Sequence, residues 1–188
     1  MTNTIVIAEL NKGSIHSTTK ELVSAAQMLG NSCTVIVPCT DSSVADSISS
    51  TSGVAKVIVA KSEIFANYDA SGWASAIDSV TPEGTIITSA SPQSKDLAAR
   101  LAARRKLSVV QDVVSIQDGQ LTSPVYSGKA MQTVSVSGNT VVSIRQNVFD
   151  ASPDGGSAEV SVIDASGNVA TAVKELISRA SERLDVSE

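Results

Sequence analysis

The only histidine of the chain, His16, is the first candidate for chemistry because it follows residues 4–8, an apolar segment typical of a β-strand. The carboxyl ends of strands in α/β sheets often carry ligand-binding loops. No serine, aspartate or cysteine can be placed beside His16 from the sequence alone, so a catalytic role for it is not favoured. We expect no catalytic residue in this chain.

Glycine spacing excludes two kinds of phosphate-binding loop. Gly13, Gly30 and Gly53 match neither G-x-G-x-x-G nor G-x-x-x-x-G-K-[ST]. The hydroxyl-rich loop at residues 89–94 follows a strand-like segment and opens a helix, whose free N–H groups could bind an anion. The alternative, which we favour, is a helix N-cap with Pro92 at the first helical position.

Metal and nucleic-acid sites are not indicated. Cys33 and Cys39 flank one strand-like segment and have no second cysteine pair or histidine cluster near them, which favours two buried, reduced thiols. The net charge is −5 and the acidic residues are scattered. The one basic cluster has no aromatic residues interleaved, and we interpret it as the solvated last turns of a helix. Its members are Arg100, Arg104, Arg105 and Lys106.

The elements that position these residues alternate between strands and helices. Apolar residues make up 42% of the 188 residues and aromatic residues only 3%, as in sheets of Val and Ile covered by Ala-rich helices. We expect strands at 4–8, 34–37, 55–60, 85–88 and 107–110, and helices from Ser17 or Thr18 to Gly30 and at 44–50, 68–80 and 93–106. This alternation predicts an α/β fold with a parallel sheet flanked by helices.

The pattern changes after Asp112. Asp118-Gly119 and Gly138-Asn139 each lie between strand-like segments and predict two hairpins of an additional antiparallel region. Residues 151–156 are small, polar and turn-like, and residues 170–184 carry an apolar stripe typical of a helix. We therefore divide the chain into an α/β domain at 1–150 and a linker with a C-terminal helix at 151–188.

Targeting and membrane segments are not indicated. The first residues lack a basic region followed by a long apolar run, so no secretion signal is visible. No apolar stretch approaches the roughly 20 residues needed to span a bilayer. We expect a soluble protein without membrane insertion.

Four stretches, in this order and spacing, resemble the amino-terminal domain of electron transfer flavoprotein alpha subunits. They are residues 5–9 (IVIAE), 94–103 with 110–113 (SKDLAARLAA and VQDV), 125–130 (VYSGKA) and 142–149 (VSIRQNVF). The resemblance runs over about residues 4–185. The chain departs from the family at Ser94, Ala99 and Ser123, where members commonly have Gly, Pro and Arg.

The resemblance implies a three-layer, Rossmann-like fold of the adenine nucleotide alpha-hydrolase type. It also implies a heterodimer with a beta subunit, which takes electrons from acyl-CoA dehydrogenases and related flavoenzymes and commonly passes them to a quinone reductase. FAD would be held by a C-terminal domain whose motifs do not follow Leu184, so no cofactor is expected on this chain alone. AMP, where present, belongs to the beta subunit. The implied location is the cytoplasm, or the mitochondrial matrix in a eukaryote.

Five positions match the family pattern: Arg100, Asp112, Tyr126, Gly128 and Arg145. They have a structural interpretation, in which Gly128 makes a turn, Arg145 and Asp112 join hairpin to sheet, and Tyr126 is a packed aromatic. In the alternative interpretation Arg145 and Tyr126 face the beta subunit or the flavin domain. A second function also stays open, namely a stand-alone adenine-nucleotide module of the universal stress type, with its ligand after the first and fourth strands.

Overall fold

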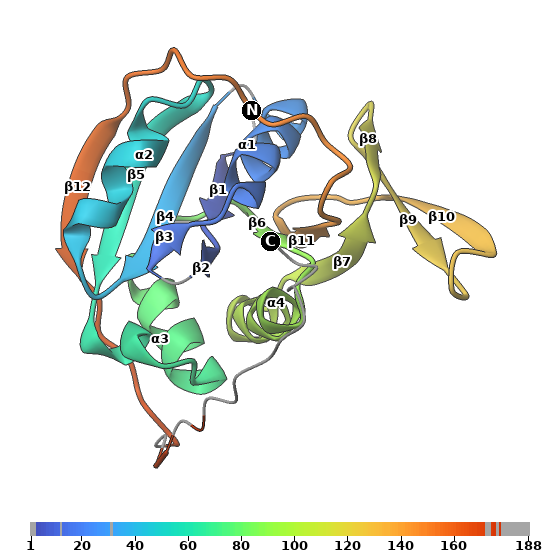
Figure 1. Cartoon of the computed structure of the whole chain (residues 1–188). Helices are drawn as coiled ribbons and strands as arrows, with labels where there is room; N and C mark the ends of the chain where they lie inside the picture. Colours follow the sequence, from blue (N-terminus) through green and yellow to red (C-terminus); the bar gives the residue numbers. More distant parts are fainter. Residues whose placement is uncertain (1–2, 12, 31, 172–173, 176, 178–188) are drawn as a thin grey trace.

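A seven-stranded parallel sheet forms the centre of the protein in the computed structural model, which describes residues 3–11, 13–30, 32–171, 174, 175 and 177 (Figure 1). The strand order is β12-β5-β4-β1-β6-β11-β7. The strands are β1 (Thr4–Ile7), β4 (Cys33–Cys39), β5 (Val54–Lys61), β6 (Thr85–Ser89), β7 (Ser108–Val113), β11 (Thr140–Ile144) and β12 (Glu159–Asp164). The predicted α/β class and all five predicted strands are confirmed.

Helices cover both faces of the sheet and make three layers. One face packs on α1 (Thr18–Leu29) and α2 (Asp46–Ser49), and the other packs on α3 (Ala70–Val80) and α4 (Pro92–Arg105). Successive strand residues point to opposite faces, so a strand covered on both faces is buried along its whole length and is mostly apolar. All four residues of β1 are buried for this reason. Two short 3₁₀ turns complete this part, η1 (Ser42–Ala45) and η2 (Glu63–Ala66).

Local signals fix where the helices begin. The Ser91 side chain accepts a hydrogen bond from the Ser94 N–H at 3.2 Å, and Pro92 follows it at the start of α4. Ser17 forms no side-chain cap on α1. The cap of α1 is instead the His16 ring, whose Nδ1 accepts from the Thr18 N–H at 3.2 Å. The predicted start of this helix at Ser17 or Thr18 is confirmed, but the capping hydrogen bond comes from the preceding histidine and not from a serine or threonine side chain.

Three antiparallel strands form an arm beside the main sheet, which Figure 1 shows to the right of β7. We call β8 (Ser115–Gln117), β9 (Gln120–Val125) and β10 (Ala130–Ser135) the arm. The predicted hairpin at Asp118-Gly119 is confirmed, and both turn residues have positive φ. A further small hairpin joins β2 (Leu10–Asn11) to β3 (Ser14–Ile15).

The predicted hairpin at Gly138-Asn139 is wrong. Residues 140–144 do not pair with β10; they form β11, which lies between β6 and β7 and is parallel to both. The physical reason is burial, because all five residues of β11 are buried, whereas a hairpin strand of the arm would leave alternate residues in water.

After residue 150 the chain crosses α1 and α2 and reaches the far edge of the sheet. We call residues 150–158 the strap. Ser152 is buried and its N–H donates to the Lys20 carbonyl of α1, while the Ala158 N–H donates to Ser49 of α2. The strap leads into β12, a strand that the sequence analysis did not predict.

The predicted helix at 170–184 lies mostly outside the described residues. Its described positions, 170, 171, 174, 175 and 177, belong to no helix. No described helix combines the length and the apolar character needed to cross a bilayer.

Candidate functional site

The first candidate site lies where the strand order reverses, between β1 and β6. Strand β4 follows β1 on one side, and the strands after β6 lie on the other side. Such a reversal leaves a crevice at the carboxyl ends of the strands. A cavity of about 380 Å³ lies there, lined by Glu9, His16, Ser91 and Gln146 among others.

The helix starts at this crevice are already capped. The His16 ring accepts a hydrogen bond from the Thr18 N–H of α1, and the His16 carbonyl accepts one from the Thr19 N–H. At α4, Ser91 accepts from Ser94 through its side chain and from Lys95 through its carbonyl. The N-cap interpretation of residues 89–94 is confirmed, and these capped N–H groups are not free to bind a phosphate.

A carboxylate further disfavours an anion in the crevice. Ser89, a residue that is 1% exposed, donates a hydrogen bond from its hydroxyl to Glu9 Oε2. Glu9 lines the cavity directly. A negatively charged Glu9 side chain would repel a nucleotide phosphate in this crevice, where the sequence analysis left an adenine-nucleotide site open.

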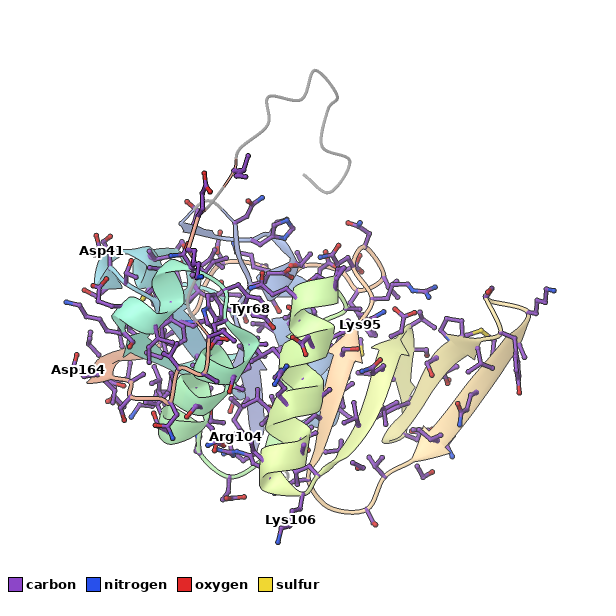
Figure 2. All side chains as sticks on the ribbon, turned by 90° about the horizontal axis from the view of Figure 1, so that it is seen from below. Asp41, Tyr68, Lys95, Arg104, Lys106 and Asp164 are labelled. Atoms are coloured by element: carbon purple, nitrogen blue, oxygen red, sulfur yellow. The ribbon has the colours of Figure 1, made fainter. Side chains whose placement is uncertain are left out.

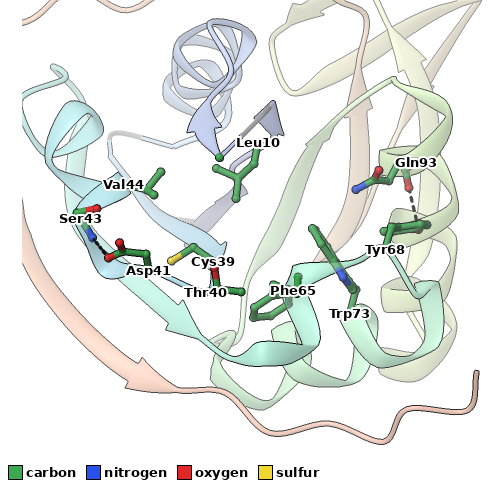
Figure 3. A pocket seen from close by; sticks show the side chains of 12 residues that line it. Leu10, Cys39, Thr40, Asp41, Ser43, Val44, Phe65, Tyr68, Trp73 and Gln93 are labelled. Carbon is green, nitrogen blue, oxygen red and sulfur yellow. Dashed lines mark hydrogen bonds between the residues drawn. The ribbon is translucent and has the colours of Figure 1, made fainter. Parts of the chain in front are cut away.

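A second cavity, of about 490 Å³, lies at the carboxyl ends of β4 and β5 (Figure 3). Figure 3 shows Asp41 and Cys39 on one side and three aromatic rings on the other. Hydrogen bonds from Ser43 hold the pKa of Asp41 below its usual range, and burial raises the pKa of Cys39. No lysine or arginine in the described chain lines this cavity. The rings belong to Phe65, Tyr68 and Trp73.

The described residues hold no group of three His, Cys, Asp or Glu side chains suited to a metal. At the crevice, the starts of α1 and α4 are capped and the Glu9 carboxylate lies in the lining. The described residues there do not fit the pyrophosphate of a flavin, and no step through a cofactor is derived from them.

Two of the predicted site residues, Asp112 and Arg145, form an ion pair at the base of the arm. Arg145 donates from Nε to Asp112 Oδ1 at 3.1 Å and from Nη2 to Oδ2. These bonds hold the pKa of Asp112 below its usual range and raise the pKa of Arg145. Lys95 Nζ lies 3.8 Å from Asp112 Oδ1 and adds a second cation.

The backbone at Asp112 has an unusual conformation. Its φ is +62°, a region that few residues other than glycine adopt, and its N–H donates to the Ser143 hydroxyl at 2.9 Å. The Arg145 N–H donates to the Val113 carbonyl at 3.0 Å. These contacts join the ends of β7 and β11 at the point where the chain leaves the main sheet for the arm.

Tyr126 and Gly128 lie at the other end of the arm, in the turn between β9 and β10. Gly128 has a φ of +83°, which suits the predicted turn. Tyr126 is 81% exposed, so it is not the packed aromatic of the structural interpretation. Met131, which follows on β10, is 57% exposed. The arm thus presents two large apolar side chains to solvent.

Arg100 lies apart from the ion pair at the base of the arm. It is exposed on α4 and donates to Asp96 at 3.1 Å, one helical turn away. The structure brings together Asp112 with Arg145, and Tyr126 with Gly128, but not Arg100 with either.

The basic cluster at the end of α4 is not simply solvated, which corrects the sequence interpretation. The Arg105 side chain is 13% exposed and donates to Asp78 Oδ1 at 2.6 Å. It also donates to the carbonyls of Asp78, Thr81 and Pro82 at the end of α3. The sequence carries no signal for this contact, because the partners lie 23 to 27 residues away.

Sequence reasoning also missed Glu21. This buried carboxylate of α1 accepts a hydrogen bond from the Asn147 N–H at 2.8 Å and fixes the loop after β11. An acidic residue in the first turn of a helix is ordinarily assigned to the helix dipole. Its high burial is therefore visible only in the structure.

Comparison with known proteins gives a consistent result. The family model described as electron transfer flavoprotein domain matches residues 4–168. The electron transfer flavoprotein subunit alpha of Mycobacterium tuberculosis is 29% identical over 167 residues, covering 85% of this chain and 52% of the relative. The mitochondrial subunit alpha of Arabidopsis thaliana is 32% identical over 181 residues, covering 87% and 50%. The chain spans about half the length of these curated relatives.

Proposed function

Because this chain belongs to the electron transfer flavoprotein domain family, we propose that it is the amino-terminal scaffold domain of an alpha subunit and pairs with a beta subunit. In this proposal the heterodimer carries electrons from acyl-CoA dehydrogenases and related flavoenzymes to a quinone reductase. FAD is bound by a C-terminal domain of that subunit and not by the residues that the structure describes. The protein acts in the cytoplasm, or in the mitochondrial matrix of a eukaryote.

The observation that carries the proposal is the arm. Among the described residues, no lysine or arginine lines either cavity at the carboxyl edge of the sheet, and the starts of α1 and α4 are capped. The arm, in contrast, exposes Tyr126 and Met131 to solvent, while its Ile116 and Leu121 pack on the core of the main fold. Large exposed aromatic and methionine side chains are enriched at protein–protein contacts. Scaffolding by protein contact is therefore the role that the geometry supports best.

The test is binding of the beta subunit encoded in the same genome, measured by titration calorimetry. We expect a one-to-one complex for the unaltered chain and weaker binding for Tyr126→Asn, since asparagine tolerates the positive φ at this turn. Met131→Ser has a matched control in Met28→Ser, because Met28 lies on α1 and is 56% exposed against 57%. Only the arm variant should weaken the complex.

The same titration tests whether Arg145 contacts the beta subunit. If it faces the beta subunit, Arg145→Ala should weaken binding while the chain stays folded; unchanged binding would leave it a structural residue. Absence of any beta-subunit complex would refute the proposal. Saturable binding of AMP to the isolated chain would instead favour an adenine-nucleotide module.

A further inference from the structure

A groove of about 540 Å³ separates β7 from the arm. One wall is made of four consecutive residues of β7, from Val109 to Asp112, and the other includes three consecutive residues of β9, from Ser123 to Val125. Side chains alternate between the two faces of a strand. A wall lined by consecutive residues is therefore the edge of a strand and not its face. The groove runs between two strand edges.

The two edges meet at one end only. The Val114 N–H donates to the Thr122 carbonyl at 2.8 Å, and beyond this bond β7 and β9 separate (Figure 1). Pro124 of β9 has no N–H, so it cannot continue a ladder toward β7. The shape is a wedge that is held closed near the base of the arm and kept open further along.

The β7 edge of this wedge has unpaired backbone groups. In the described chain β7 pairs only with β11, so its other edge carries N–H and C=O groups that no strand partners. Such an edge accepts an additional strand, with main-chain hydrogen bonds for affinity and side-chain contacts for specificity. Val109, which is 38% exposed, and the partly buried Val125 and Val134 supply apolar contacts.

The charge at the closed end of the groove favours a binding segment that carries an acidic residue. Lys95 and Arg145 share one carboxylate, that of Asp112, which leaves a net positive charge beside the groove. Lys95 and Asp112 line the groove directly. An occupant with an acidic residue at this end is favoured.

We propose that the groove receives an extended segment of the beta subunit, which adds to the free edge of β7 as an eighth strand and places an acidic side chain near Lys95. This inference rests on the proposed function, because it names where the beta subunit binds. The arm then covers the added strand from the other side through β9 and β10.

Proline variants test the strand addition. Successive residues of an edge strand point their N–H groups alternately inward, to the neighbouring strand, and outward. One of the two variants Val109→Pro and Val110→Pro therefore removes an outward N–H and leaves the pairing with β11 intact. This variant should stay folded and bind the beta subunit about tenfold more weakly, which corresponds to roughly 1.4 kcal/mol of binding free energy. Val162→Pro and Ile163→Pro on β12, at the opposite edge, are the control, and the folded member should bind normally.

Charge reversal tests the orientation. Lys95→Glu should weaken the complex, while Lys106→Glu should not, although both residues lie on or next to α4. Figure 2 labels them at opposite ends of this helix. Equal effects of the two reversals would overturn the acidic contact.

Hydrogen exchange in the complex keeps the inference testable if the proline variants unfold. Backbone amides of residues 108–112 should exchange at least about tenfold more slowly once the beta subunit is bound. A complex that forms without slower exchange there overturns this inference and leaves the proposed function standing. Outward amides that are already protected in the free chain would mean that the chain fills its own groove, and this too overturns it. Failure to form any complex refutes the proposed function instead.

Discussion

Replacing Arg105 by alanine is expected to lower the free energy of unfolding by about 3 kcal/mol. Arg105 is 13% exposed and satisfies one carboxylate and three carbonyls at the end of α3. Hydrogen bonds to charged groups contribute about 1.5–3 kcal/mol each, and breaking a buried pair costs about 3–5 kcal/mol. The lower part of that range applies because Asp78 is 24% exposed and keeps its contact with Arg104.

Arg104→Ala is the matched control. Arg104 is the preceding residue and contacts the same carboxylate at 3.2 Å, but its side chain is 46% exposed. An exposed pair contributes about 0–1 kcal/mol. Urea denaturation measures both variants, and a loss of 3 kcal/mol corresponds to about 6–12 °C in Tm for a chain of this size. Equal losses for the two variants would refute the assignment of Arg105 as the cap of α3.

Three further predictions concern backbone, charge and thiol. Gly84→Ala should lower the free energy of unfolding by about 2–4 kcal/mol, since an added Cβ would lie 2.3 Å from the Asn3 carbonyl oxygen. Gly119→Ala is its control in the same urea assay. An added Cβ there would meet nothing within 4 Å, so the positive φ alone should cost about 1–2 kcal/mol. Asp112→Asn should destabilise the chain most above pH ~4. Because Arg145 lowers the folded-state pKa of Asp112, the extra stability of the unaltered chain over Asp112→Asn should be lost as the pH falls through this lowered pKa. A difference in urea midpoint that persists in strong acid would argue against the ion pair. Burial raises the pKa of Cys33 to about 12, so at mildly alkaline pH this thiol should react with iodoacetamide only after unfolding, as mass spectrometry would show.

The sequence predicted the main sheet well because its signals there are local. Residues such as Ile5 and Val35 lie in short, continuous apolar runs, which both faces of a covered sheet require. The Asp118-Gly119 turn was also predictable, because these two residues tolerate the positive φ that a tight hairpin needs. The cap of α4 at Ser91 follows from similar local chemistry.

Elements that depend on distant partners were not predictable. Gly138-Asn139 has the composition of a hairpin turn, yet β11 joins β6 and β7 because its buried residues fit between them. In the turn of the arm Gly128 was predictable, but the positive φ of the preceding Tyr126 was not, because a bulky residue rarely adopts it. Strand β12 depends on the strap crossing two helices. For the candidate site, polar contacts of Asp112 and Arg145 between hairpin and sheet were expected, but not that the two residues pair with each other beside Lys95 and a groove.

The position of β11 between β6 and β7 also sets an order of folding. Strand β7 is synthesised before β11 but cannot reach the sheet without it, because β11 separates β7 from β6. Until residue 144 has left the ribosome, β7 has no neighbour in the sheet, and the arm is a local hairpin unit tethered to it. Such long-range pairing is slow and exposes strand edges to other chains. During that interval the edges of β6 and β7 lack the strand that pairs with both of them in the folded chain.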